Sequence, residues 1–370
     1  MIASARHLMA TNGSLTHTHR PPVADPTAAI AGRGVQRWLY TLALLVFAMV
    51  VIGGATRLTG SGLSITEWQP IVGTLPPLSD AAWLEAFSKY QQIPQYQTIN
   101  KGISLEAFKA IFWWEWGHRL LGRLIGVVFL LPFLGFLLRG SIDRPLAWRL
   151  SVLFALGGLQ GALGWYMVKS GLSVRTDVSQ YRLAAHLLAA SALMAALLWT
   201  AIDIGSVERR RRIRLRTLAQ GSTTIAGVIL ALVFLQIGAG ALVAGMKAGL
   251  AYNTWPLMDG HLVPAGLAAM SPVWANAFEN AATVQFDHRW IAYVLAALVI
   301  WQGVRVRTSA DDERMTRSAA ALVALVVMQF ALGIWTLVSH VPLHLALAHQ
   351  ASAMLVLAAA VWHLHTLVRE

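Results

Sequence analysis

The sequence predicts an all-α integral membrane protein with eight transmembrane helices, arranged as two repeated four-helix bundles. Three observations lead to this fold class. The 370 residues are 56% hydrophobic and only 12% charged, whereas soluble domains carry about 25% charged residues. Eight apolar runs are long enough to cross a bilayer, which takes about 20 residues. Short motifs also recur on either side of an Arg-rich midpoint.

The apolar runs define the predicted spans in order. The spans are 37–55, 116–138, 147–168, 182–202, 222–245, 288–306, 317–338 and 343–366. The polar residues 1–36 predict a flexible cytoplasmic tail; a mitochondrial targeting segment is the alternative, since Asp25 is their single acid. The chain has no cysteine, which excludes disulfides, thiolate ligands and iron–sulfur clusters.

Arginine is concentrated in the loops on one side of the predicted membrane. These loops include 139–149, 209–216 and 305–317, and both termini fall on the same side. By the positive-inside rule that side is the cytoplasm, so the long loops 56–115 and 246–287 lie outside. The net charge of +12 then reflects orientation in membrane lipid and does not indicate nucleic-acid binding.

The Arg-rich linker 206–221 divides the spans into an N-terminal bundle, 37–205, and a C-terminal bundle, 222–370. Two motifs recur in both halves: Gly-Leu with Trp five residues after the Leu, and Gln followed by Gly four residues later. The motif pairs are 62–68 with 249–255, and 160–164 with 329–333. Because each half has an even number of spans, both insert the same way up, related by a pseudo-two-fold axis along the membrane normal.

Four histidines occupy equivalent places near the outer ends of the spans. They are His118 and His186 in the first half, and His288 and His349 in the second. Two helices of each bundle thus present a His at similar depth, so two imidazoles can lie on opposite faces of one planar macrocycle. A single His at such a place usually forms a hydrogen bond to a neighbouring helix. Four His at equivalent places instead favour the ligation of haem by pairs of histidines. Two His per bundle do not complete a zinc site.

One carboxylate breaks the symmetry of the halves. Glu115 precedes His118 by one helical turn, and the equivalent residue in the second half is Gln285. A carboxylate that serves the repeated fold would be expected in both halves, whereas a carboxylate that takes part in a reaction is needed in only one. The asymmetry therefore predicts that the first bundle holds the reacting molecule and that the second holds a permanent electron-transfer haem. Glu115 is expected to move protons or to stabilise developing positive charge. The alternative is an interfacial Glu paired with Arg119 or another nearby cation.

Three arginines are candidate partners of haem propionates. Arg119 and Arg289 each follow a proposed ligand, and Arg57 ends the first span. A guanidinium suits a carboxylate because it can donate two parallel hydrogen bonds. The alternative for each is a plain interfacial anchor.

The chain resembles the haem A synthase family over nearly its whole length after the tail. The resemblance rests on Gly-Gly-Ala-Thr-Arg-Leu-Thr-Gly-Ser-Gly-Leu-Ser at 53–64, Glu-Trp-Gly-His-Arg at 115–119 with Gly-Arg at 122–123, and Asp-His-Arg at 287–289, together with His186 and His349. It implies that a methyl group of haem O is oxidised to the formyl group of haem A, by two hydroxylations and loss of water. Haem A then supplies cytochrome c oxidase.

The same resemblance implies roles for individual residues. His288 and His349 would ligate a resident haem b, His118 and His186 would serve the substrate haem, and Glu115 would serve catalysis. Without cysteine the chain resembles the proteobacterial and mitochondrial class of the family. The implied partners are the haem O synthase that supplies the substrate, cytochrome oxidase assembly factors, and an electron donor that the residues leave open. The expected location is the bacterial inner membrane rather than the mitochondrial one.

Three other functions fit the residues less well. A di-haem b-type electron-transfer protein linked to quinone would not need the unmatched Glu115. A transporter would place charges at mid-membrane, whereas here the polar residues lie toward the outer rim. The prenyltransferase one step earlier would need acid-rich motifs for a diphosphate and Mg²⁺, and only the acidic run 311–313 is present.

Overall fold

The computed structural model describes residues 26–173, 175–207, 219–309 and 312–369. Eight of the helices in these residues are long and apolar enough to cross a membrane, which confirms the predicted all-α fold class and its spans. They are α1 (Pro26–Leu58), α4 (Leu105–Leu138), α5 (Arg144–Lys169), α6 (Gln180–Val207), α7 (Ala219–Gly245), α9 (Ala281–Ser309), α10 (Glu313–Val338) and α11 (Leu343–Arg369). Most of the predicted tail and linker lie outside the described residues.

Several helices begin before the predicted spans because polar residues cap them. Asp143 accepts a hydrogen bond from the backbone at the start of α5, and Asp312 does so at the start of α10. The difference is largest for α4, which Ser104 caps, so that it starts well before the predicted boundary at 116. Glu115 and His118 therefore lie inside a helix, not at the helix mouth where the sequence placed them.

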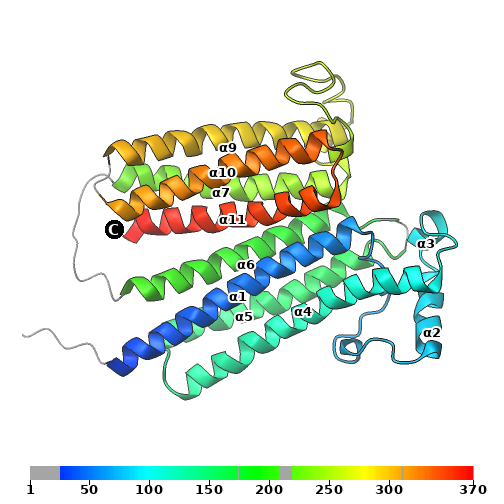
Figure 1. The fold of residues 1–370 in the computed structure, drawn as a ribbon, viewed down its shortest axis with the longest axis horizontal. Helices are drawn as coiled ribbons and strands as arrows, with labels where there is room; N and C mark the ends of the chain where they lie inside the picture. Colours follow the sequence, from blue (N-terminus) through cyan, green and yellow to red (C-terminus); the bar gives the residue numbers. More distant parts are fainter. Residues whose placement is uncertain (1–25, 174, 208–218, 310–311, 370) are drawn as a thin grey trace, which may run out of the picture.

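The spanning helices form two bundles of four (Figure 1). In the first, α1 and α5 each contact both α4 and α6. In the second, α7 and α10 each contact both α9 and α11. Each contact within one bundle thus has its equivalent in the other, which agrees with the predicted duplication.

The bundles meet along α1 and α6 on one side and α7 and α11 on the other. A single cluster of buried apolar side chains joins them, with members such as Leu39, Leu197, Ile229 and Leu357. Polar bonds also cross this boundary, for example from Gln350 Nε2 on α11 to a backbone carbonyl of α1. The shared core holds the two bundles at a fixed separation.

The long loops lie at one end of the helices, opposite the described chain ends (Figure 1). The first contains η1 (Val72–Thr74), α2 (Asp80–Tyr90) and α3 (Pro94–Thr98); the second contains η2 (Ala248–Leu250), η3 (Val273–Ala275) and α8 (Asn276–Glu279). Trp83 and Tyr90 pack with Phe108 and Phe112 of α4. This aromatic cluster explains why the first turns of α4 are helical although they precede the apolar run.

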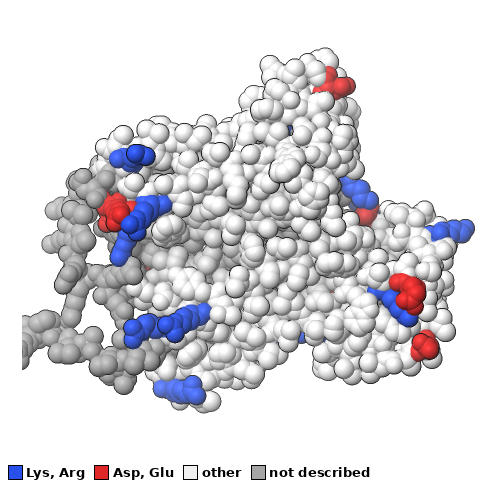
Figure 2. Space-filling model, viewed as in Figure 1, with Lys and Arg blue, Asp and Glu red and all other residues white. Residues whose placement is uncertain are grey.

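The charged side chains gather toward the two ends of the helices (Figure 2). Between these ends the visible face is almost entirely uncharged. The spanning helices carry exposed apolar side chains, such as Leu131 of α4 at 64% and Leu159 of α5 at 61% exposure. Apolar side chains are stable on such a surface when lipid surrounds it. The surface therefore fits a protein that spans a bilayer.

Candidate functional site

Each predicted ligand histidine lies against a glycine of a neighbouring helix. A Cβ built on these glycines would come within about 3 Å of the imidazole ring, a distance at which the ring has to move. The pairs and distances are His118 with Gly53 (3.0 Å), His186 with Gly164 (3.1 Å), His288 with Gly240 (3.1 Å) and His349 with Gly333 (2.9 Å). The two glycines of each bundle occupy equivalent positions in the repeat.

The structure brings the histidines together in the predicted pairs. His118 and His186 lie close enough for their charges to interact, and so do His288 and His349. Among the described residues, no three His, Asp or Glu side chains converge into a group that could hold a metal ion. The geometry thus provides two separate two-histidine sites, one in each bundle.

Glutamine side chains hold the backbone or ring of three of these histidines. Gln160 Nε2 donates to the carbonyl of His186 at 3.4 Å, and the equivalent Gln329 donates to the carbonyl of His349 at 3.1 Å. Gln236 Nε2 lies 3.1 Å from both Nδ1 and the carbonyl oxygen of His288. The equivalent of Gln236 in the first bundle is an apolar residue, Met49, so the two sites differ beside their first histidine.

The two-histidine sites fit a planar group bound between imidazoles. The Nδ1 atoms of His186 and His349 are buried and have no partner among the described residues. A buried polar atom without a partner is costly, and a bound group with its own hydrogen-bonding or metal centre relieves that cost. The glycines beside the rings leave room for the imidazoles close to the helix backbones.

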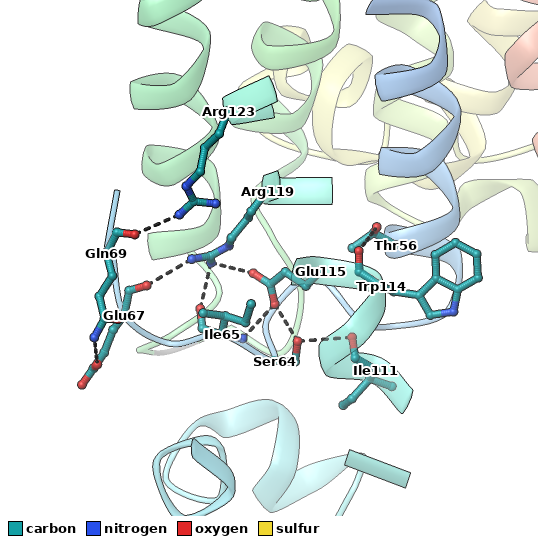
Figure 3. Close-up of polar contacts among 10 residues, drawn as sticks. All are labelled: Thr56, Ser64, Ile65, Glu67, Gln69, Ile111, Trp114, Glu115, Arg119 and Arg123. Carbon is teal, nitrogen blue, oxygen red and sulfur yellow. Dashed lines mark hydrogen bonds and ion pairs between the residues drawn. The ribbon is translucent and has the colours of Figure 1, made fainter. Parts of the chain in front are cut away.

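Glu115 is buried, at 2% exposure, and both of its oxygens are engaged. Oε1 pairs with Arg119 Nη2 at 2.6 Å. Oε2 accepts hydrogen bonds from Ser64 Oγ and from the backbone N–H of Ile65, both at 2.8 Å (Figure 3). The carboxylate therefore fixes the start of the first outer loop onto α4, and the pairing with Arg119 that the sequence offered as an alternative is present.

Arg119 and Arg289 perform the same task in the two halves. Arg119 donates to the carbonyls of residues 65 and 67, and Arg289 donates to the carbonyls of the equivalent residues 252 and 254. Gln285 stands in for Glu115 and donates to the carbonyl of residue 252 at 3.0 Å. Both outer loops are thus clamped by an Arg, but only the first clamp contains a carboxylate.

Arg57 lies apart from these clamps. Its Nη1 donates to the carbonyl of Ala244 on α7 at 3.0 Å, so the guanidinium is at the boundary between the bundles and not beside Glu115. Asp177 is close enough to interact with its charge. The sequence motif at 53–64 identified Arg57 as noteworthy but could not indicate this position, because α7 follows nearly two hundred residues later.

Comparison with known proteins gives consistent matches. Residues 36–361 match the model of a family described as cytochrome oxidase assembly protein. A curated protein of Parvibaculum lavamentivorans named heme A synthase is 53% identical over 332 residues, covering 90% of this chain and 94% of the relative. Similar proteins of the same name occur in Azorhizobium caulinodans, with 54% identity over 91% of this chain and 95% of the relative, and in Nitrosospira multiformis, with 51% identity over 95% and 98%.

Proposed function

The chain belongs to the family of cytochrome oxidase assembly proteins that includes the haem A synthases, and we propose that its first bundle is where haem O is oxidised to haem A. It is an enzyme of haem A biosynthesis. The reaction converts a methyl group to a formyl group: two hydroxylations each insert one oxygen atom, and the resulting diol loses water. The alternative of a di-haem electron-transfer protein without substrate oxidation is not favoured, because relatives about 50% identical over most of the chain are haem A synthases.

The first bundle is assigned to the substrate because Glu115, one turn before His118, is a carboxylate where the second bundle has the amide Gln285. His118 and His186 would hold the iron of haem O from opposite faces. Glu115, fixed by three donors, adds a negative charge that does not have to reorganise as positive charge develops on the substrate. Arg119 would keep the loop above the site in place, and Arg57 would serve a propionate from the boundary between bundles.

The second bundle is assigned to a resident haem b. His288 and His349 would hold its iron, and Arg289 would secure the outer loop and serve a propionate. Haem b, when bound, supplies one-electron transfer. Gln236 would position His288 by donating from Nε2 to its backbone carbonyl at 3.1 Å.

The setting follows from the same assignment. The chain is a multi-pass membrane protein, and because its similar relatives are bacterial, its membrane would be the bacterial inner membrane. Its substrate would come from a haem O synthase, its electrons from a separate donor, and its product would go to cytochrome oxidase and its assembly factors.

The haem content of four single His→Ala variants tests the two assignments. Loss of His288 or His349 is expected to remove the spectrum of the resident haem b from the purified protein. Loss of His118 or His186 is expected to spare that spectrum and abolish haem A formation in cells. If all four variants keep wild-type haem content, or if each removes the same haem, the assignment of two separate sites is wrong.

A further inference from the structure

The first outer loop contains a stretch, residues 70–78, that is apolar and exposed; we call it the apolar loop segment. It has no charged residue. Its large side chains are between 69% and 84% exposed, and they are Ile71, Val72, Leu75 and Leu78. Neighbouring apolar side chains that are exposed in this way mark a surface for a membrane or for a protein partner.

The start of the apolar loop segment is held against the side of α4. Arg123 Nε donates to the carbonyl of Pro70 and Arg123 Nη2 donates to that of Gln69, both at 2.9 Å (Figure 3). Arg123 lies 15 residues before Leu138, the last residue of α4, which corresponds to about 23 Å of helix. Because the hydrocarbon core of a bilayer is about 30 Å thick, these contacts lie near the edge of that core on the side of the long loops.

Trp68, just before the apolar loop segment, lies at the level of a membrane–water interface. Its ring contacts that of Trp165 on α5, with centroids 4.8 Å apart. Trp165 is 21 residues after Arg144, the first residue of α5, which corresponds to about 32 Å of helix. Tryptophan is enriched at this level. The chain therefore passes the interface at Trp68 and turns back beside α4 to reach Arg123 (Figure 1).

The backbone of the apolar loop segment has few free polar groups. The prolines at 70, 76 and 77 have no N–H. The N–H groups of residues 73, 74 and 75 donate to the carbonyls of residues 69, 71 and 72. An unpaired backbone group is costly in hydrocarbon, so this bonding makes the segment compatible with lipid.

We propose that the apolar loop segment inserts into the outer leaflet, the leaflet on the side of the long loops, and anchors the loop that Glu115 clamps. Its large side chains contact acyl chains, while the carbonyls at its start stay bonded to Arg123. The loop is then held from two sides, by α4 and by lipid. In the second half Asp259 stands at the position equivalent to Val72, and a charged side chain disfavours insertion at that place.

Single fluorescent probes test the insertion, since the chain has no cysteine of its own. Bimane is attached in detergent to Val72→Cys, to Leu75→Cys, and to Lys101→Cys as the aqueous control, because Lys101 is exposed in the same outer loop. Each full-length protein is then reconstituted in phosphatidylcholine vesicles. Quenching is measured with a spin label near the headgroup end of the acyl chain and, separately, with iodide in the water.

The lipid spin label is expected to quench bimane in Val72→Cys and Leu75→Cys strongly. Iodide should quench these two at least about fivefold less than Lys101→Cys, because an ion is excluded from hydrocarbon. Adding Val72→Asp, which copies the second half, to Leu75→Cys should raise iodide quenching about threefold or more. Leu84→Asp is the matched control, since Leu84 is an exposed apolar residue on α2, and it should leave the quenching unchanged.

Iodide quenching of Val72→Cys and Leu75→Cys as strong as that of Lys101→Cys would show that the segment lies in water and would overturn the proposal. Weak quenching by both agents would overturn it as well, because a protein partner that covers the segment produces that result. Should Val72→Asp not fold, the three single-cysteine variants decide the question by themselves. The outcome does not depend on which haem either bundle binds.

Discussion

Replacing Glu115 by glutamine tests the clamp on the first outer loop. The glutamine keeps the shape of the side chain and one acceptor oxygen, which can still serve Ser64 Oγ or the N–H of Ile65. Its amino group then has to face Arg119, which donates to Glu115 at 2.6 Å in the native protein. The substitution thus turns a buried ion pair into two opposed donors.

The cost of this change follows from the burial of the pair. Removing one partner of a buried ion pair costs about 3–5 kcal/mol. The side chain of Glu115 is only 3% exposed but that of Arg119 is 22% exposed, so solvent relieves part of the loss. We expect local destabilisation of the loop by about 2–3 kcal/mol.

Hydrogen exchange of the peptide that covers residues 64–67 measures the effect directly. Glu115→Gln should speed exchange there by about 30- to 150-fold, the factor that corresponds to 2–3 kcal/mol. Glu106→Gln is the control, because Glu106 is on the same helix and pairs with Lys109 while 79% exposed; exposed pairs contribute below about 1 kcal/mol. Unchanged protection in Glu115→Gln would refute the clamp, and full haem A formation by that variant in cells would refute its role in the reaction.

Two further substitutions test the packing of the second bundle. Gly333→Ala puts a Cβ 2.9 Å from the His349 ring. It should weaken retention of the haem b proposed for the second bundle by about 1–3 kcal/mol, measured as haem occupancy after purification. Gly227→Ala, where a Cβ meets nothing within 4 Å, should retain that haem fully, and equal losses would contradict the contact. His363→Leu removes a buried hydrogen bond of 2.9 Å to Ser318 Oγ. It should lower the free energy of unfolding by about 1–3 kcal/mol. An unchanged thermal midpoint of unfolding in detergent would show that this bond does not stabilise the bundle.

Much of the candidate site could be predicted because it follows from short-range patterns. The spans follow from hydropathy, and the histidine pairs follow from motifs that recur at matching depths in two halves. The glycines beside the rings also left a signal, since Gly53 and Gly240 precede the recurring Gly-Leu motif by the same number of residues. Their purpose could not be read from the sequence, because the rings they contact belong to other helices.

The start of α4 was mispredicted for a similar reason. The run of apolar residues suggested a boundary at 116, but the helix begins at Leu105. The earlier turns are stabilised by Trp83 and Tyr90, which pack on Phe108 and Phe112. These contacts come from a separate segment of the outer loop, and hydropathy along the helix does not register them.

The sequence by itself determined the eight spans, the family, the four histidines and the carboxylate that only one half contains, because hydropathy, helical period and motif identity are local properties. Only the tertiary structure decided what Glu115 contacts. It pairs with Arg119 and accepts hydrogen bonds from Ser64, which is 51 positions away in the chain, and from Ile65. It also decided that Arg57 lies at the boundary between the bundles. These features depend on which helices pack together. Packing brings together segments that are far apart in the chain, and their separation in sequence does not predict the contact.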